Sequence, residues 1–131
     1  MVQLRKEKMA NKVFLNKGDV IEQIYDGRQT FQSVTKAAAR VMLLGDELHK
    51  NKKKIRILID VSGITTVSAD ALLAAADSLN TILKSKIAVY GGSNLINKLA
   101  NLVIVATGRD KTVKIFKTRK AAERWMKDSN V

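Results

Sequence analysis

Residues 55–83 read IRILIDVSGITTVSADALLAAADSLNTIL, and this stretch decides how the rest of the chain is arranged. Its first part, Ile55–Val61, is an almost unbroken apolar run that is rich in β-branched side chains. Such a run is too short for a helix and is typical of a strand that is buried on both faces of a sheet. We therefore expect a central parallel strand here, with neighbouring strands on both sides and helices above and below.

A polar segment follows the apolar run and leads directly into a helix. Hydroxyl and carboxylate side chains gather in it at Asp60, Ser62, Thr65, Thr66, Ser68 and Asp70. Because open α/β sheets place their sites at the carboxyl ends of central strands, we predict that this segment is a turn that forms a binding surface. The same groups also have an ordinary structural use, since Asp and Ser side chains bond to backbone amides in turns and cap helices.

The helix after this turn is expected to have Ser68 or Thr66 as its N-cap and Asp70 in its first turn, where the helix dipole favours a negative charge. Its apolar residues are predicted to line one face at Ala69, Leu72, Leu73, Ala76, Leu79 and Leu83. The high alanine content predicts a close approach of this helix to the sheet.

The length and composition indicate one ordinary globular domain. The chain has 131 residues, of which 46% are hydrophobic, so it can bury a core without cross-links. It contains no cysteine, which excludes disulfides, thiol catalysis and zinc–thiolate sites. Its charged N-terminus lacks the apolar segment of a signal peptide, and no apolar run approaches the roughly 20 residues of a membrane span. We expect a cytoplasmic protein with a basic arm over residues 1–11 and one domain over residues 12–131.

The charge is strongly positive. Lys and Arg number 24 and acidic residues 12, which leaves a net charge of +12. Such an excess favours a partner that is a nucleic acid or an acidic membrane surface, and an inert basic surface is the plain alternative. The cations gather in the N-terminal arm, in Lys50–Lys54 and in Arg109–Lys127. Aromatic residues make up only 5%, so a surface that stacks bases is not indicated.

The remaining segments predict the order β-β-α-β-α-β-α-β-α. Strands are expected at 13–15, 20–25, 55–61, 87–90 and 113–116, and helices at 31–50, from 68 to about 83, from about 94 to 108, and after Thr118. Gly18 is expected to supply the positive φ of the first hairpin, and Asp26–Gly27 to end the second strand. Strands that alternate with helices predict an α/β fold with a mostly parallel mixed sheet of four or five strands.

Two further segments are functional candidates. The loop of Gly91, Gly92, Ser93 and Asn94 precedes a helix and offers backbone amides to a phosphate or carboxylate, although a plain tight turn is the alternative. Its spacing matches neither a Rossmann fingerprint nor a P-loop. Leu95–Val105 is more apolar than one buried helix face needs, so it is either deeply buried or exposes a face for dimerisation or for a lipid surface.

Catalysis has little support in the sequence. The single histidine, His49, lies near a helix end, with no serine or acid at a spacing that indicates a triad. Asp60 and Asp70 form a carboxylate pair, but no further ligand accompanies them for a hard metal. We therefore predict a protein that is not an enzyme and holds no cofactor or metal. A hydrolase that uses Asp60 is the weakest alternative.

Three passages, in this order and spacing, carry a family resemblance: Ile57–Gly63, then Ile87–Ser93, then Val113–Phe116 followed by Ala121, Ala122 and Trp125. From about Ile24 to Met126 the chain resembles the STAS-like superfamily, and within it the SpoIIAA-like branch, which is related to anti-sigma factor antagonists and to CRAL-TRIO-type domains. The resemblance implies a single-domain STAS-like fold with about four helices and a regulatory, protein-binding function.

The resemblance also bears on regulation. In anti-sigma factor antagonists a partner kinase phosphorylates a serine at the start of the helix after this strand, and the phosphate prevents docking. In this sequence Ala69 and Asp70 stand where that family has two consecutive serines, and Ser68 lies one residue earlier. Ser62, Thr66 and Ser68, with Thr65, are the hydroxyls in this segment that remain as acceptors.

We therefore expect a regulatory module that docks a partner protein, or a small apolar or anionic ligand, through residues 60–70 and the loop of residues 91–94. Homodimerisation is a further expectation. The alternative is association with an anionic membrane or nucleic acid through Lys50–Lys54 and Arg109–Lys127. Salt separates the two functions, because electrostatic binding weakens steeply as the ionic strength rises.

Overall fold

The computed structural model describes residues 11–82 and 85–128. In this part of the chain the elements follow the predicted order: β1 (Lys12–Leu15), β2 (Ile21–Gln29), α1 (Phe31–Lys50), β3 (Arg56–Val67), α2 (Ala69–Thr81), β4 (Lys86–Tyr90), α3 (Asn94–Ala106), β5 (Val113–Phe116) and α4 (Arg119–Lys127). Residues 1–10 of the predicted arm, and Leu83, lie outside the described residues. The last residue of that arm, Asn11, is buried and donates to the side chain of Gln29.

The described strands form a five-stranded sheet in the order β1-β2-β3-β4-β5. The β1–β2 pair is antiparallel, and the pairs β2–β3, β3–β4 and β4–β5 are parallel. The predicted mixed sheet is therefore confirmed, with β3 at its centre. Each parallel pair is joined by a helical crossover, as parallel strands require.

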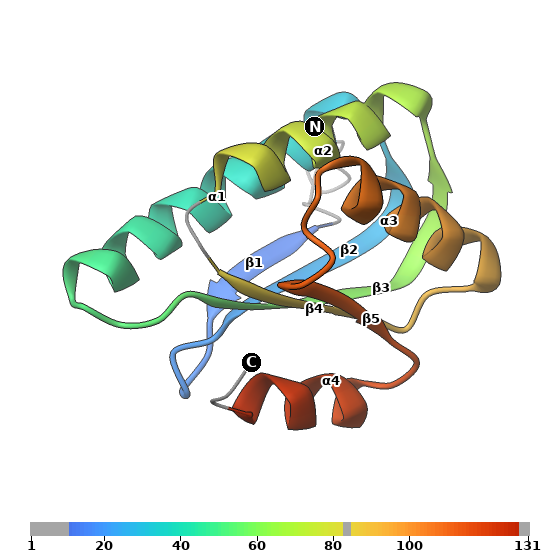
Figure 1. The fold of residues 1–131 in the computed structure, drawn as a ribbon. Coiled ribbons are helices and arrows are strands. Elements are labelled where there is room, and N and C mark those ends of the chain that lie inside the picture. The colour runs from blue at the N-terminus through green and yellow to red at the C-terminus, as the bar shows by residue number, and fades with distance from the viewer. Residues whose placement is uncertain (1–10, 83–84, 129–131) are drawn as a thin grey trace, which may run out of the picture.

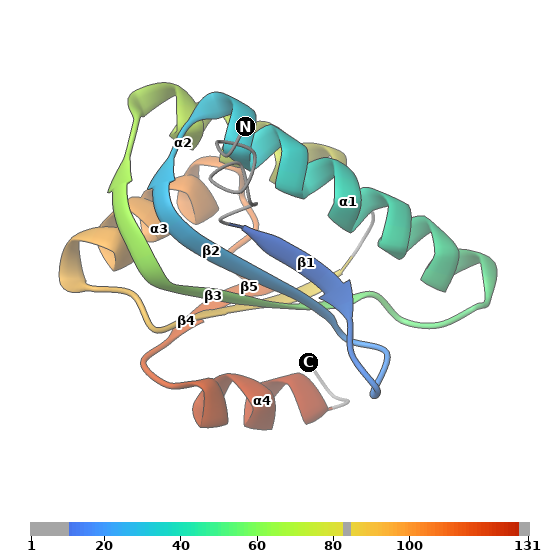
Figure 2. The same ribbon diagram turned by 180° about the vertical axis from the view of Figure 1, so that it is seen from behind.

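The helices lie on both faces of the sheet. Among the described helices, α1, α2 and α3 lie above it and α4 alone lies below, as the two opposite views show (Figures 1 and 2). The alternation of side chains along a strand separates the two cores. Ile57 and Ile87 pack in the core under the upper helices. Their neighbours Leu58 and Ala88 pack against Ala122 and Met126 of α4.

The first hairpin is built differently from the prediction. Asp19, with φ 61°, adopts the left-handed conformation that was assigned to Gly18, whose φ is not positive. The side chain of Asn16 accepts hydrogen bonds from the amides of Gly18 (2.8 Å) and Val20 (3.1 Å) and so organises the turn. Asp tolerates this backbone region better than most residues do, because its short polar side chain can bond locally.

The second strand also runs further than predicted. Asp26–Gly27 does not end β2, which continues to Gln29. Register shifts flank this dipeptide, and Gly27 has a φ of 79°, so it forms an irregularity within the strand. Glycine permits this because it adopts positive φ without a steric cost.

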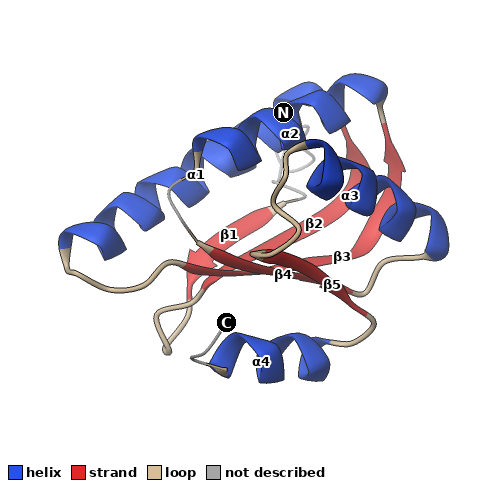
Figure 3. Cartoon of the chain, in the orientation of Figure 1, coloured by secondary structure: helices blue, strands red, loops and turns tan. Residues whose placement is uncertain are grey.

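The largest difference from prediction lies after Asp60. Residues 60–67 are strand and not a turn, because β3 continues to Val67 and pairs with β2 as far as Gln29. The pairing of β3 with β4 stops at Asp60 and Tyr90. Beyond that point β2 and β3 continue alone and bend toward the upper helices (Figure 3). The β-branched residues Ile64, Thr65 and Thr66 suit this extended conformation.

The buried face of α2 also differs from the one predicted. Ala71 and Ala74 are buried and pack with Val34 of α1, whereas Ala69 is exposed and Leu73 is 70% exposed. The alanines therefore bring α2 close to α1, and Tyr25 and Val67 of the sheet pack against them as well. Of the predicted face, Leu72 and Leu79 line the cavity above the sheet. The predicted cap at Ser68 is confirmed, and Thr30 and Thr118 cap α1 and α4 in the same way; each hydroxyl accepts from the backbone amide three residues later.

Candidate functional site

The ends of two strand segments meet at the centre of the predicted site. Asp60 is the last residue of β3 that pairs with β4, and Gly91 follows the last residue of β4. A Cβ atom at Gly91 would lie 3.0 Å from the Cβ atom of Ser62. Gly91 also has a φ of +86°, so glycine is required here both for its conformation and for the close approach. The structure thus brings Asp60 and Ser62 next to the loop of residues 91–94, as predicted.

Asp60 and Ser62 form a local hydrogen-bonded unit. The carboxylate Oδ1 atom of Asp60 accepts from the backbone amide of Ser62 (2.9 Å) and from its hydroxyl (2.7 Å). Ser62 is exposed, so its hydroxyl oxygen can still accept a hydrogen bond from outside. The unit presents a negative charge and an acceptor to solvent beside Gly91.

The loop of residues 91–94 has a clear structural use. Ser93 is the N-cap of α3, and its hydroxyl accepts from the amide of Ile96 (3.2 Å). A Cβ atom at Gly92 would lie 2.6 Å from Oδ1 of Asn97 and 3.1 Å from Val61, so the loop packs tightly on β3. These contacts agree with the tight turn that was one of the two interpretations. Anion binding by this loop stays a prediction.

The other predicted site residues lie elsewhere. Thr65 and Thr66 are exposed on the outer part of β3, and Ser68 caps α2 by accepting from Ala71 (3.2 Å) while donating to Asp70. Six residues of strand at about 3.3 Å each place Ser68 roughly 20 Å from Ser62 along the chain. The predicted surface is therefore two separate groups. We call Asp60, Ser62 and residues 91–94 the exit surface.

Asp60 and Asp70 do not act as a pair, because each carboxylate bonds to its own neighbouring serine. Among residues 11–82 and 85–128 there is no group of three or more His, Asp or Glu side chains that could hold a metal ion. His49 is exposed at the end of α1.

Helix α3 presents apolar side chains to solvent directly after the exit surface. Leu95, Leu102 and Val105 are 65%, 63% and 62% exposed, while Val103 and Ile104 of the same helix are buried. Leu95 and Leu102 are seven residues apart and so lie on one side of the helix. The helix is thus buried on one side and exposes apolar side chains on another, while dimerisation or lipid binding through them stays a prediction. We call Leu95, Leu102 and Val105 the outer face of α3.

An apolar cavity of about 170 Å³ lies between the sheet and the three upper helices. Its lining is almost entirely aliphatic, and the phenol of Tyr25 and the amide of Gln23 are among its few polar groups. The Gln23 amide donates to the Tyr25 hydroxyl (2.6 Å), and burial raises the pKa of Tyr25. The sequence reasoning missed this cavity. The one signal was the alanines of the upper helices, such as Ala38, Ala75 and Ala100, which leave space above the sheet.

A charged cluster fastens α4 to the lower face of the sheet. Two nitrogens of Arg119 donate to the two carboxylate oxygens of Glu22, each at 2.9 Å, and one of them also donates to the hydroxyl of Tyr90 (3.1 Å). The Arg119 hydrogen bonds lower the pKa of Glu22, although burial opposes this. Burial raises the pKa of Tyr90, and the negative charge of Asp60 adds to this increase. The hydrogen bond from Arg119 opposes this increase.

Comparisons with known proteins identify the fold. No family model matches the sequence, and no curated protein matches it. The solved structure of the anti-sigma factor antagonist SpoIIAA in its unphosphorylated form is similar with a TM-score of 0.62 and 8% identity, over 88% of this chain and 97% of that one. An anti-sigma factor antagonist from Mycobacterium paratuberculosis has a TM-score of 0.63 and 18% identity, over 90% and 93% of the two chains.

A third structure, an uncharacterised protein with a SpoIIAA-like fold from Shewanella loihica, has a TM-score of 0.58 and 18% identity, over 89% of this chain and 92% of that one. The chain therefore has the SpoIIAA-like α/β fold that the sequence resemblance implied. Among the described helices, none is long and apolar enough to cross a membrane.

Proposed function

We propose that this protein is a non-enzymatic regulatory module that binds a partner protein through the exit surface and the outer face of α3. Two of the similar structures are anti-sigma factor antagonists, which supports a regulatory role but does not name the partner. The polar groups of the exit surface are held by local hydrogen bonds, between Asp60 and Ser62 and between Ser93 and Ile96. Groups that are fixed in this way suit the binding of a partner protein better than the catalysis of a reaction.

The observation that carries the proposal is the apolar outer face of α3 next to a polar rim. Of the eight large hydrophobic side chains that are exposed in the described residues, three lie on α3. Exposed apolar side chains on one side of a helix, with polar groups beside them, are typical of protein-binding sites, and here the exposed Lys98 lies between Leu95 and Leu102. Here Leu95 and Leu102 would supply the buried contacts, and Ser62 and Asp60 the hydrogen bonds at the edge.

We further propose that phosphorylation of Ser62 would weaken this docking. Its hydroxyl is exposed and lies 2.7 Å from the carboxylate of Asp60. A phosphate would place about two negative charges beside that carboxylate, and the repulsion would open the local unit. At Ser68 a phosphate would meet Asp70 in the same way, although its oxygens would still accept from the first amides of α2. Thr66 remains a third candidate.

The experiment is affinity capture of the partner from the native cell extract, with Leu102→Ser compared with Leu43→Ser. The two leucines are matched, because Leu102 on α3 is 63% exposed and Leu43 on α1 is 69% exposed. We expect Leu102→Ser to reduce the captured partner about tenfold, as the loss of a central interface contact does, and Leu43→Ser to leave it unchanged. Equal capture by both variants would contradict the proposal.

A further inference from the structure

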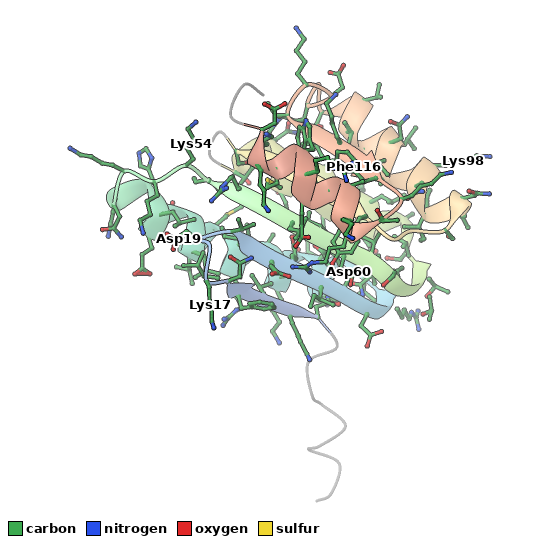
Figure 4. All side chains as sticks on the ribbon, turned by 90° about the horizontal axis from the view of Figure 1, so that it is seen from below. Lys17, Asp19, Lys54, Asp60, Lys98 and Phe116 are labelled. Atoms are coloured by element: carbon green, nitrogen blue, oxygen red, sulfur yellow. The ribbon has the colours of Figure 1, made fainter. Side chains whose placement is uncertain are left out.

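A second concave site lies at the other end of the sheet. A groove of about 780 Å³ is formed where β3 and β4 begin, just before β5, and beside the end of α4. In Figure 4, Lys17, Asp19 and Lys54 lie toward this end of the molecule, whereas Asp60 and Lys98 lie toward the opposite end. The groove is therefore separate from the exit surface, and it brings together residues that are distant in the sequence.

The groove is strongly positive. Within the described part of the chain its cations are Lys53, Lys54, Arg56, Lys86, Lys111 and Lys127. Asp19 and Asp128 are the carboxylates among the described lining residues, so positive charge is in excess by four. We call this set of residues the basic groove. Its cations come from the two basic segments, around residues 50–54 and 109–127, that stand out in the sequence.

The positive charges of the groove lie close to one another. Lys53 of this groove forms an ion pair with the carboxylate of Asp19 at 2.8 Å. Lys86 donates to two neutral carbonyl oxygens, those of Trp125 and Asp128, each at 2.6 Å. Burial lowers the pKa of Lys86, and the nearby charges of Arg56 and Lys54 lower it further, while Asp128 opposes this. The cations are thus close enough to repel one another.

A buried hydroxyl in the groove wall gives a second observation. Ser85 lines the groove, is 6% exposed, and its Oγ atom has no hydrogen-bond partner among the described residues. Buried hydroxyls are nearly always bonded, so each exception needs an explanation. Because Ser85 is among the residues that line the groove, the variant Ser85→Ala below tests whether its hydroxyl donates to an acceptor oxygen of a bound ligand.

The size and lining of the groove indicate which class of ligand fits it. Its volume is within the roughly 300–1,000 Å³ that is typical of small-molecule sites. Among its described lining residues there is no aromatic side chain, so it lacks the stacking platforms of single-strand nucleic acid sites. A membrane surface is flat and would not fill a concave groove. We propose that the basic groove binds a compact oligophosphate, either inorganic or carried by a small molecule.

The test is calorimetric titration of the full chain with inorganic tripolyphosphate, and with orthophosphate for comparison. We expect saturable binding of one tripolyphosphate per chain, at least about tenfold tighter than that of orthophosphate, which weakens as salt rises from about 50 to about 300 mM. Absence of tripolyphosphate binding, or equal affinity for orthophosphate, would overturn the proposal. Because this site is remote from the exit surface, either result leaves the proposed docking function to its own test.

Variants decide whether the binding belongs to the groove. The double variant Lys54→Gln/Lys111→Gln removes two groove charges, and Lys36→Gln/Lys98→Gln removes two exposed charges elsewhere. We expect the groove variant to weaken tripolyphosphate binding at least about tenfold and the control less than about twofold, because distant charges are screened by salt. Ser85→Ala should weaken it about fivefold, the effect of one lost hydrogen bond.

Equal losses in the two double variants would show binding to net charge alone and would overturn the proposal. A single-stranded RNA oligomer and phosphatidylserine vesicles serve as competing probes. Tighter binding of either one, lost selectively in Lys54→Gln/Lys111→Gln, would overturn the oligophosphate assignment in favour of nucleic acid or membrane. Failure of both probes to compete with tripolyphosphate supports it.

Discussion

Glu22 is a buried charged residue that contacts three elements of the fold. It is 7% exposed, and its carboxylate is held by Arg119 from α4 and by the side chain of Asn16 (2.9 Å). A buried carboxylate is stable only where such partners replace its hydration. This single residue therefore ties the first hairpin, the sheet and α4 together.

The first prediction is that the free energy of unfolding depends on pH because Glu22 titrates. Its folded pKa lies below the ordinary value of 4.5 because Arg119 bonds to the charged form. The stabilising contribution is thus full above about pH 4.5 and is lost as the pH falls through the lower folded pKa. We predict that Glu22→Gln lowers the free energy of unfolding by about 1–2 kcal/mol at neutral pH. Urea unfolding should show this difference shrinking toward zero below pH 4.5, whereas a constant difference would contradict the assignment.

Gly91 is the second residue on which the site depends. Gly91→Ala would meet both an unfavourable φ of +86° and a contact of 3.0 Å with Ser62. Gly108→Ala is the matched control, because its φ is +70° but nothing lies within 4 Å of its Cβ position. We predict that Gly108→Ala costs about 1 kcal/mol from backbone strain and that Gly91→Ala costs at least about 1 kcal/mol more. Thermal unfolding of the two variants measures the difference, and equal losses would show that the close packing has no effect.

At the scale of elements, β3 is the central strand and has two parts that are paired differently. Its inner part lies between β2 and β4, and its outer part, beyond Asp60, pairs with β2 alone among the described strands. The exit surface forms where the pairing with β4 stops. The position of the site therefore follows from the difference in length between two neighbouring strands.

Ser68 gives a prediction at this scale. Its hydroxyl caps α2 through the amide of Ala71, and Ser68→Ala removes that bond. We predict a loss of about 1 kcal/mol in the free energy of unfolding, as is usual for an N-cap, and retention of most of it in Ser68→Asn, which can still cap. Chemical denaturation of both variants is the measurement. Equal destabilisation by alanine and asparagine would mean that the cap is not the relevant contact.

The elements themselves show how far sequence reasoning extends. The strand core at Ile57–Ile59 and the limits of α1 were predictable because their apolar patterns have one clear period. The outer part of β3 was not, since glycine and hydroxyl residues there suit a turn as well as a strand. The pairing of this segment with residues 26–29, which are distant in the sequence, is what makes it a strand. The face of α2 was predicted only in part, since Leu72 and Leu79 line the interior but Leu73 is exposed. Alanines occur all around this helix, so the apolar pattern alone does not define its buried side.

For the candidate site, sequence reasoning located Asp60, Ser62 and the loop of residues 91–94, because the exits of neighbouring parallel strands meet at one edge. It wrongly placed Ser68 and Asp70 beside these residues, because a turn would keep the two ends of this segment close together. The segment is a strand, which carries Ser68 and Asp70 away from Ser62. Exposure of Leu102 likewise depends on how α3 is rotated on the sheet, which tertiary packing decides.

At the scale of the whole molecule, the sheet separates distinct regions. Three helices cover its described upper face and enclose the apolar cavity, while α4 is clamped below by charge (Figure 1). The exit surface and the basic groove lie at opposite ends (Figure 4). The proposed docking surface and the basic groove therefore do not compete for space.

The cavity gives a prediction for the whole fold. Ala75 on α2 and Ala100 on α3 both line it, and neither is tightly enclosed. Ala75→Val and Ala100→Val each add two methyl groups to the unfilled volume, so each should raise the free energy of unfolding by about 0.5–1 kcal/mol. Ala122→Val is the control. Ala122 is 0% exposed in the packed core under α4, so the larger side chain should lower the free energy of unfolding. Thermal unfolding is the measurement. Melting temperatures that fall as much in the two cavity variants as in the control would contradict the presence of the cavity.

The most direct measurement is backbone hydrogen–deuterium exchange of the chain alone and in complex with the captured partner. Docking through the exit surface and the outer face of α3 predicts slower exchange over residues 91–106 in the complex, with α4 and the basic groove unchanged. Slower exchange confined to α4 or to the groove, with α3 unaffected, would contradict the proposed docking surface.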